Sequence, residues 1–504
     1  MAKEKESKTI ERPPVVAVLG HIDHGKSTLL DFIRKSTVVE HEVGGITQHV
    51  NAYEIFHTTK EGKEARITFI DTPGHAAFAT SRRRGANIAD IAIIIISAEE
   101  GVKEQTLESI KVAESAGVPF IIAINKIDKP NANPEKVKSG LVEHRYYVEG
   151  YGGSIPCVLI SSKTGDGISE LLDIIILLSD LEGFSGNKKE NASGFVLESF
   201  VDGRVGITAT LIIKNGTLSI GDYFINDHMI SKIKRLEYFD GTPMKEASFS
   251  QPVHIYGLSE MALPGETFKV FSSKNDALLY QKELSPKNKI VSSVEFKEGE
   301  EDTRMTFPLV IKGDYIGTLE AICQEGLKLS TDRVRVKILA SGIGNITEKD
   351  IKLAESAENP IIIGFNVKID KAGKDLAEND RIPVHMFNIV YRITEFLEKE
   401  LIKRTPKITE EVLIGKAKVI RLFSETKKAQ VLGAKVLEGN IKNGAIVKVH
   451  RNKNEIGQGK IKELQKDRVP AKEAREGDQF GATIERKVGI ALGDELLAYE
   501  LIEK

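Results

Sequence analysis

The chain has 504 residues and a formal net charge of −2; 41% of its residues are hydrophobic, 29% are charged and none is tryptophan. At roughly 100–200 residues per domain, this length predicts about three to five domains. The two cysteines, Cys157 and Cys323, are far apart, which excludes a disulfide scaffold and a cysteine–zinc site. The near-neutral charge argues against a chain that binds nucleic acid with a uniformly basic surface. No apolar run approaches the ~20 residues that cross a bilayer, so we expect a cytoplasmic protein without membrane contact.

Residues 1–12 are rich in Lys and Glu and predict a short disordered tail rather than a secretory signal. From residue 13 to 182, β-branched runs alternate with helical patterns, which is typical of a parallel sheet covered on both faces. The expected strands are residues 15–19, 67–70, 91–96, 120–124 and 158–160, and helices are expected at 28–35 and 105–116.

Short strands separated by turn signals predict a small antiparallel β-barrel over residues 192–272. A polar linker or an irregular helix is expected at 273–302, and a small α/β domain at 303–384. Thr347, with Asp350 three residues later, predicts a capped helix start in this domain. Its expected strands are 306–311, 334–339 and 360–366, and its expected helices are 315–324 and 347–358.

A helix is expected over residues 385–405, because apolar residues recur every three to four positions from Met386 to Leu401. It is either a core helix of the third domain or a rigid connector, and the domain that begins right after Pro406 favours the connector. Residues 407–504 again show short strands and turns and predict a second β-barrel. The predicted fold class is therefore multidomain, with α/β domains and β-barrels.

A phosphate-binding loop is predicted where a strand is followed by the pattern G-x-x-x-x-G-K-S. Its glycines let backbone N–H groups approach a phosphate chain at a helix N-terminus. Lys26 would reach the β- and γ-phosphates, and the Ser27 hydroxyl would bind Mg²⁺. The residues assigned to this loop are Gly20, His21, Ile22, Asp23, His24, Gly25, Lys26, Ser27 and Thr28.

A second phosphate-side element, Asp71-Thr72-Pro73-Gly74, follows the predicted strand 67–70. Asp71 at the strand end can hold Mg²⁺ through water, and the Gly74 amide can contact the γ-phosphate. Thr47 lies between the two elements, where a threonine can close over Mg²⁺ only when the γ-phosphate is present. The predicted metal ligands are therefore Ser27, Thr47 and, through water, Asp71.

The choice of base is predicted from Asn125-Lys126-Ile127-Asp128, at the end of another strand. The Asp128 carboxylate can accept two hydrogen bonds from guanine, whereas adenine offers no such donor pair. Lys126 would lie across the ring, Asn125 would support the loop, and Ser161, Ser162 and Lys163 would complete the base pocket. All these elements lie at carboxyl ends of strands, where open α/β sheets bind ligands. The pattern argues against a P-loop kinase or ATPase.

His75 directly follows Gly74, at the position where Ras-like switches carry the glutamine that orients water, and we expect it to orient the hydrolytic water. Arg82, Arg83 and Arg84 follow on a helical stretch. A solvated face is the favoured interpretation of this charge run, and contact with RNA phosphates is the alternative.

Taken together, these motifs resemble bacterial-type translation initiation factor two, a family of translational GTPases. The resemblance runs from residue 13 to about 430 and is not limited to the nucleotide site. The similar segments are residues 44–49, 71–75, 84–87, 125–130, 192–194, 215–218, 341–348 and 362–367. The resemblance implies a GTP/GDP cycle with Mg²⁺, binding to both ribosomal subunits, and delivery of formylmethionyl initiator tRNA by a monomer.

The resemblance also implies that the last barrel binds the aminoacyl end of initiator tRNA. Ala434 and Phe480 stand where family members usually carry cysteines, so we expect weaker selection for formylmethionine if the Phe480 ring fills the pocket. The residues expected to bind tRNA are Gly433, Lys466, Arg468, Gln479, Phe480 and Gly481.

The predicted function is a translation initiation GTPase that promotes initiator tRNA binding and subunit joining. Two alternatives stay open: another ribosome-associated GTPase of elongation or specialised type, and a GTP-gated RNA-binding protein with little turnover. Ribosome-dependent phosphate release would separate an enzyme from a binding protein.

Overall fold

The computed structural model describes residues 9–34, 47–283, 304–405, 409–426, 429–452, 454–466, 469–486 and 488–503. Two compact units divide the chain, Met1–Lys403 and Arg404–Lys504. The first contains a six-stranded sheet, an eight-stranded antiparallel sheet and a four-stranded parallel sheet, and the second contains a closed ring of strands. The predicted fold class is confirmed. No helix in the described ranges is long and apolar enough to span a membrane.

The first domain is built on a six-stranded sheet in the order β3-β4-β2-β5-β6-β7, parallel except for the β3–β4 pair. A further two-residue strand, β1 (Ile10–Glu11), pairs with β8 (Ser185–Gly186). The strands are β2 (Val15–Gly20), β3 (Asn51–Thr58), β4 (Glu64–Asp71), β5 (Ile91–Ser97), β6 (Phe120–Asn125) and β7 (Cys157–Leu159). The helices are α1 (Lys26–Arg34), the 3-10 helix η1 (Ala76–Phe78), α3 (Ala79–Ile88), α4 (Glu104–Ser115), α5 (Pro134–Glu143) and α6 (Ile168–Glu182).

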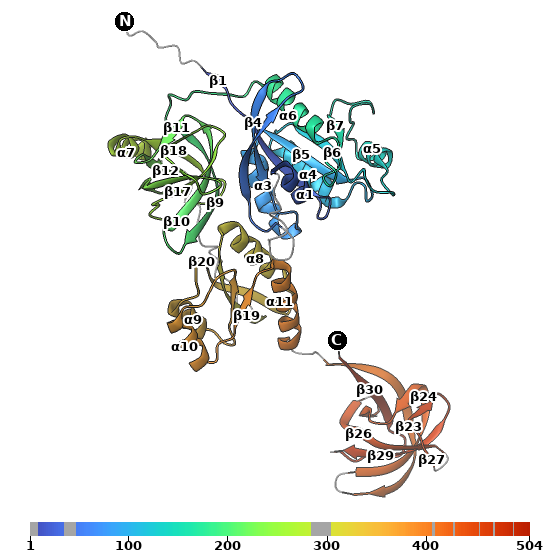
Figure 1. Cartoon of the computed structure of the whole chain (residues 1–504). Coiled ribbons are helices and arrows are strands. Elements are labelled where there is room, and N and C mark those ends of the chain that lie inside the picture. Colours follow the sequence, from blue (N-terminus) through green and yellow to red (C-terminus); the bar gives the residue numbers. More distant parts are fainter. Residues whose placement is uncertain are drawn as a thin grey trace. The chain divides into compact units, whose positions relative to one another are not determined.

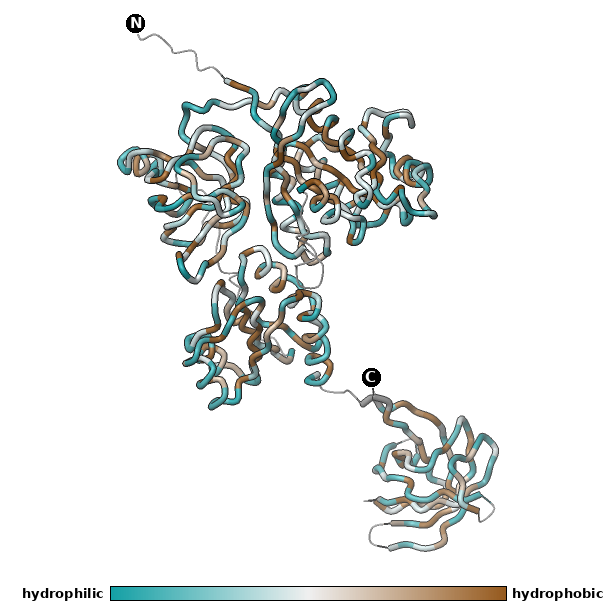
Figure 2. Tube along the Cα trace, in the orientation of Figure 1, coloured by the Kyte–Doolittle hydropathy of each residue, from teal (hydrophilic) through white to brown (hydrophobic). Residues whose placement is uncertain are grey.

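Helices cover both faces of this sheet (Figure 1). One core cluster joins the strands to Leu29 of α1 and Leu171 of α6, and another joins them to Ile110 of α4 and Leu141 of α5. All seven residues of β5 are buried, as the continuous apolar run predicts for a central parallel strand. In Figure 2 the central strands of this sheet are coloured as hydrophobic. The prediction did not include β3, an edge strand whose outer half alternates in exposure.

The second domain is antiparallel throughout, in the order β13-β12-β18-β9-β10-β17-β14-β15 with a separate β11–β16 pair, and its apolar residues form one core. Helix α7 (Lys274–Glu283) lies within the segment predicted as a linker or irregular helix. The rest of that segment, residues 284–302, lies outside the described residues. The strands are β9 (Ser193–Asp202), β10 (Gly206–Asn215), β11 (Thr217–Ser219), β12 (Tyr223–Ile225), β13 (Ile230–Lys232), β14 (Arg235–Tyr238), β15 (Pro243–Met244), β16 (Glu246–Ser248), β17 (Pro252–Tyr256) and β18 (Thr267–Phe271).

The third domain has a four-stranded parallel sheet in the order β20-β19-β21-β22. Thr347 caps α9 through a reciprocal capping box with Asp350, as predicted. The strands are β19 (Met305–Gly313), β20 (Val334–Ile343), β21 (Ile361–Phe365) and β22 (Val384–Phe387), and the helices are α8 (Ile316–Lys328), α9 (Glu348–Glu355), α10 (Lys371–Asn379) and α11 (Val390–Arg404).

The helix predicted from residue 385 begins later, at Val390, because His385 and its neighbours form the edge strand β22. Val390, Ile393, Leu397 and Leu401 of α11 are buried in the core of the third domain. The favoured interpretation of this helix as a connector was therefore incomplete: its apolar stripe belongs to that core.

In the second unit, the ladder β23-β30-β25-β26-β29-β24 closes through an additional β23–β24 pairing, which confirms a C-terminal β-barrel. Its interior is a single apolar cluster. The strands are β23 (Thr409–Glu425), β24 (Ala429–Lys442), β25 (Ile446–Arg451), β26 (Asn454–Lys466), β27 (Val469–Pro470), β28 (Glu473–Arg475), β29 (Gln479–Arg486) and β30 (Glu495–Glu503).

Candidate functional site

The loop between β2 and α1 has the backbone of a phosphate-binding turn. Gly20 and Gly25 have φ angles of +142° and +90°, and Asp23 has a φ of +60°. A Cβ atom on Gly20 would lie 2.5 Å from the Ile95 carbonyl oxygen, so only glycine fits there. His24 is fully buried against β5, and burial lowers its pKa to about 3, which keeps its ring neutral.

Lys26 lies inside this loop at the start of α1. Its Nζ donates to the carbonyl oxygens of Gly20 (3.0 Å) and His21 (2.6 Å). Burial lowers its pKa to about 8, although the Asp71 carboxylate opposes that shift. A Cβ atom on Gly74 would lie 2.4 Å from the Lys26 Nζ, so the loop after β4 comes into direct contact with the lysine.

The three residues predicted to bind magnesium lie together. The Ser27 Oγ is 2.9 Å from the Thr47 Oγ1, which donates to the Asp71 Oδ2 at 3.4 Å. Hydroxyl and carboxylate oxygens are the hard ligands that Mg²⁺ prefers, so this set of residues fits the ion. Gly44, Gly45 and Ile46, which precede Thr47, lie outside the described residues.

The predicted base-reading residues also come together. The Asn125 Nδ2 donates to the His24 carbonyl oxygen at 2.8 Å, and its Oδ1 accepts from the backbone N–H and hydroxyl of Ser162, both at 2.9 Å. Asn125 thus ties the phosphate-binding loop to the loop after β7. Ser161 donates to the exposed Asp128 carboxylate at 2.7 Å, which holds the pKa of Asp128 below its usual range.

Two cationic residues flank this base-reading loop. Lys126 has a left-handed backbone (φ +66°), and its Nζ lies 3.8 Å from Glu100. Lys163 is exposed next to Ser162.

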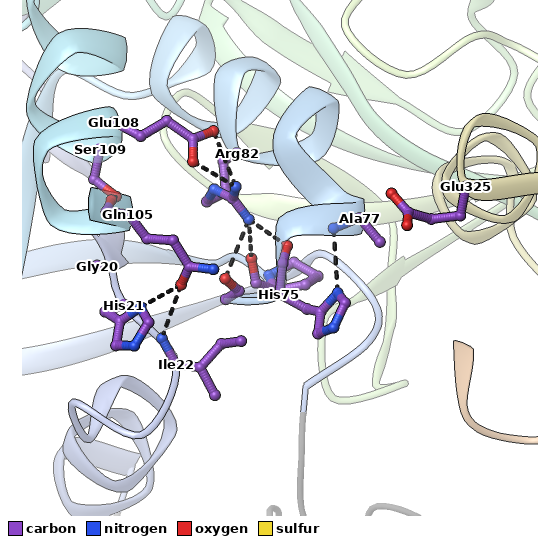
Figure 3. Close-up of polar contacts among 12 residues, drawn as sticks. Gly20, His21, Ile22, His75, Ala77, Arg82, Gln105, Glu108, Ser109 and Glu325 are labelled. Carbon is purple, nitrogen blue, oxygen red and sulfur yellow. Dashed lines mark hydrogen bonds and ion pairs between the residues drawn. The ribbon is translucent and has the colours of Figure 1, made fainter. Parts of the chain in front are cut away.

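His75 caps the N-terminus of η1 in this structure. Its Nδ1 accepts from the Ala77 backbone N–H at 3.2 Å (Figure 3). Burial and the nearby charge of Arg82 lower its pKa, although Glu325 opposes the shift. A neutral ring that accepts at Nδ1 carries its hydrogen on Nε2, so it can donate a hydrogen bond to a water molecule.

The arginine run after His75 is not a solvated face. Arg82 is 1% exposed, Arg84 pairs with Glu320 of α8 at 2.6 Å, and only Arg83 is exposed. The favoured interpretation of this run was wrong for two of the three arginines, because the sequence does not show which face of α3 packs against other elements.

Several functional candidates were missed by the sequence analysis. Gln105 of α4 accepts from the Ile22 backbone N–H at 3.3 Å and lies 2.5 Å from the His21 Nδ1, so α4 supports the phosphate-binding loop. The Gln48 Nε2 donates to the Asn388 carbonyl oxygen at 3.0 Å, and its Oε1 accepts from the Val390 N–H at 3.1 Å. Gln48, the neighbour of Thr47 in the chain, thus links the predicted magnesium site to the start of α11. The sequence places Gln48 only within the segment 44–49, which resembles the family, and gives no sign of its contact with α11.

The C-terminal barrel corrects one predicted residue. Phe480 is 3% exposed and belongs to the barrel core, and Ala434 beside it is also buried, so the ring does not line a surface pocket. Gly433 and Gly481 face each other across β24 and β29, and a Cβ atom on Gly433 would lie 3.3 Å from the ring of Phe423. Phe423 is 61% exposed and was missed.

The other residues predicted to bind tRNA have different surroundings. Gln479 is exposed, and Lys466 pairs with Asp478 at 2.7 Å. Arg468 lies outside the described residues.

Comparisons with known proteins agree with this architecture. The model of the elongation factor Tu GTP binding domain matches residues 11–180, that of elongation factor G domain 2 matches 191–271, and that of translation-initiation factor 2 matches 281–398. The chain is 38% identical over 501 residues to a translation initiation factor IF-2 of Carboxydothermus hydrogenoformans, covering 98% of this chain and 60% of the relative. An IF-2 of Rhizobium etli is 38% identical over 508 residues, covering 98% and 55%.

Among solved structures, GDP-bound aIF5B from Aeropyrum pernix is similar, with 24% identity, a TM-score of 0.49, and coverage of 97% of this chain and 92% of that one. The chain spans between about half and three fifths of the length of the curated relatives it matches.

The matched GTP-binding domain and the site together define the first domain as a guanine-nucleotide-binding domain of the translational GTPase class. The resemblance to translation initiation factor two is confirmed, since the relatives that match almost the whole chain carry that name.

Proposed function

We propose that this chain is a translation initiation GTPase, which hydrolyses GTP to GDP and phosphate on the ribosome and promotes initiator tRNA binding and subunit joining. The observation that carries the proposal is the contact of Ser27, Thr47 and Asp71, which belong to three separate elements and meet beside Lys26. A bound Mg²⁺ ion would neutralise charge on the phosphate oxygens at these ligands. We infer that Thr47 binds the ion directly only when the γ-phosphate is present.

Each residue at the phosphate end has a proposed role in that reaction. The backbone amides of residues 20–28 bind the phosphates, and the Lys26 ammonium, freed from the carbonyls that now accept from it, pairs with the β- and γ-phosphates. Gly74 turns its amide toward the γ-phosphate. His75 orients the attacking water through its Nε2–H while its Nδ1 caps η1. Catalysis of this kind is positioning and electrostatic stabilisation, so the free protein should be slow.

Base selection is assigned to the opposite end of the site. Asp128 accepts from guanine, with Ser161 fixing the carboxylate. Lys126 covers the ring with its aliphatic stem, and the loop of Ser162 and Lys163 completes the pocket. Asn125 keeps this pocket in register with the phosphate-binding loop, because it bonds to both.

The proposed partners are both ribosomal subunits and formylmethionyl initiator tRNA. The initiation role is inferred from the relatives named translation initiation factor IF-2. In the C-terminal barrel, the Phe423 ring packs over Gly433 and is itself 61% exposed, so its outer face is available for the aminoacyl end of a tRNA to stack on. Gln479 and Lys466 lie on neighbouring strands of the same sheet. We assign the protein to the cytoplasm as a monomer.

We propose the following domains. Residues 13–182 bind the nucleotide and residues 407–504 bind tRNA. Between them lie a β-domain (192–272), an α/β domain (303–384) and a connecting segment (385–405).

Phosphate release from GTP tests the proposal. The full chain is measured alone, with each ribosomal subunit, and with both. We expect release to depend on both subunits and to fall at least tenfold in His75→Ala, while GTP affinity is unchanged, because His75 contacts water rather than nucleotide. Equal release by the parent with and without ribosomes would contradict ribosome stimulation. Tight GTP binding without turnover would favour the alternative of a GTP-gated RNA-binding protein.

A further inference from the structure

Arg82, which was not among the predicted site residues, holds the backbone of the loop after β4. Its Nη1 donates to three successive carbonyl oxygens, those of Pro73 (3.3 Å), Gly74 (3.2 Å) and His75 (2.5 Å). The side chain comes from the first turn of α3 and lies almost fully buried behind that loop (Figure 3). One guanidinium thus binds the backbone of both Gly74, the proposed γ-phosphate contact, and His75, the proposed water-orienting residue.

The other end of the guanidinium is anchored on a different helix. The Arg82 Nη2 donates to both carboxylate oxygens of Glu108, at 3.1 and 3.3 Å. Glu108 lies one turn after Gln105 on α4, and Gln105 bonds to the phosphate-binding loop. Helix α4 therefore supports both sides of the phosphate site, directly through Gln105 and through the Glu108–Arg82 pair.

The neighbouring arginines have different surroundings. Arg83 is exposed, and Arg84 pairs with Glu320 of the third domain. Only Arg82 faces the site. A guanidinium suits this task because its planar fork can hold carbonyls on one side and a carboxylate on the other, which an ammonium cannot do with fixed geometry.

We propose that Arg82 is a positioning residue for GTP hydrolysis: anchored by Glu108, it fixes the carbonyls of residues 73–75, and thereby sets the directions of the Gly74 amide and the His75 side chain. This inference rests on the proposed function. A peptide plane turns as one body, so holding the Gly74 carbonyl limits the rotation of the plane that it shares with the His75 N–H. Holding the Pro73 carbonyl does the same for the Gly74 N–H, the group proposed to contact the γ-phosphate.

The test compares the full-length parent with Arg82→Lys and uses Arg83→Lys as the matched control on the same helix. Affinities for GTP and GDP are titrated, and kcat and KM for GTP are measured on ribosomes. Arg82→Lys should keep GDP affinity within about twofold, since Gly74 has no role with the diphosphate. It should lose several-fold of the preference for GTP over GDP and lower kcat by about 10- to 100-fold, the range expected from a small misplacement of reacting groups.

Glu108→Gln supplies a second variant with little risk to folding, because its side chain is 40% exposed. It keeps the length of the anchor but removes its charge, and should lower kcat in the same direction by a smaller factor. Retained GDP binding shows in each variant that the domain is folded.

The outcomes separate this inference from the proposed function. If the parent hydrolyses GTP on ribosomes and Arg82→Lys matches Arg83→Lys in both nucleotide preference and kcat, the positioning role is overturned alone. If the parent binds no guanine nucleotide, the proposed function and this inference are overturned together. If Arg82→Lys weakens GDP and GTP equally, Arg82 supports the fold rather than the γ-phosphate side, which also overturns the inference.

Discussion

The proposed contact of Lys26 with the phosphates should make the affinity for nucleotide depend on pH. Burial lowers the pKa of Lys26 to about 8, with its ammonium donating to two backbone carbonyls. A phosphate chain would raise that pKa again, so binding takes up a proton wherever the free lysine has lost one. Affinity should therefore fall as the pH rises above about 8.

Titration of GDP between pH 7.0 and 8.5 measures this effect. We expect affinity to fall about fourfold over that interval in the parent, as follows from a free pKa of about 8. Lys26→Arg should bind more weakly at every pH but lose the slope, because guanidinium does not titrate there. The same slope in both proteins would show that another group is responsible.

The proposed selection of guanine rests on a single carboxylate, that of Asp128. Asp128→Asn should weaken GTP binding by at least tenfold and favour xanthosine triphosphate, since an amide donates a hydrogen bond where the carboxylate accepts one. Competition between the two nucleotides on the full chain measures the change. Equal affinity for GTP in variant and parent would refute the assigned base contact.

At the scale of elements, Asp90 joins the N-terminal segment, the first sheet and the β-domain. It is 9% exposed as a residue and accepts from Arg12 (2.5 and 2.7 Å), from Lys214 (2.6 Å) and from the Val15 N–H (2.8 Å). Hydrogen bonds and ion pairs of this kind, from Arg12 above all, outweigh burial and hold its pKa below the usual range.

Asp90→Asn should therefore lower the free energy of unfolding of the first unit by about 3–5 kcal/mol, because two largely buried cations lose their partner. The depressed pKa means that this stabilisation is present at neutral pH and is lost as the pH falls below about 4. Urea unfolding at two pH values measures it. Asp180→Asn is the control, since the exposed Lys63–Asp180 pair should contribute less than about 1 kcal/mol. Equal effects of the two substitutions would contradict the account.

Phe480 makes a prediction about the C-terminal barrel. Because its ring packs in the core, Phe480→Cys should leave a cavity and destabilise the barrel by about 2–4 kcal/mol rather than open a binding pocket. Hydrogen exchange of strands β24 and β29 in the full chain measures the loss. Phe423→Cys should have little effect on exchange, since that ring is mostly exposed. Faster exchange only in Phe423→Cys would contradict the assignment of Phe480 to the core and of Phe423 to the surface.

The elements of the nucleotide site could be predicted because each is a local pattern: a phosphate loop between a strand and a helix, and short motifs after β4, β6 and β7. Local sequence does not show which face of an element is buried. Arg82, Arg83 and Arg84 look alike in the sequence, and only packing against α4 and α8 separates them. The three- to four-residue spacing from Met386 to Leu401 suited one long helix, but pairing of His385 with Ile363 extends the sheet instead. Whether the Phe480 side chain points into the barrel core or toward the surface depends on a one-residue shift in strand register, which the sequence does not fix.

At the scale of the whole molecule, the structure contains a direct link between the nucleotide site and the third domain. Gln48, next to Thr47, bonds to Asn388 and Val390 at the start of α11, and His49 lies 3.4 Å from Asp314. A change in the position of Thr47 on GTP binding would therefore act on these contacts. The partly exposed Arg84–Glu320 pair adds a second contact between the same two domains.

The central claim is that this chain uses GTP to drive initiation, and subunit joining tests it most directly. Small subunits carrying formylmethionyl initiator tRNA are mixed with large subunits, and joining is followed by light scattering with and without the full chain. We predict that the chain with GTP accelerates joining at least tenfold, that GDP gives no such acceleration, and that an elongator aminoacyl-tRNA cannot replace the initiator. Equal joining rates with and without the chain, or equal acceleration by GDP and GTP, would contradict the account.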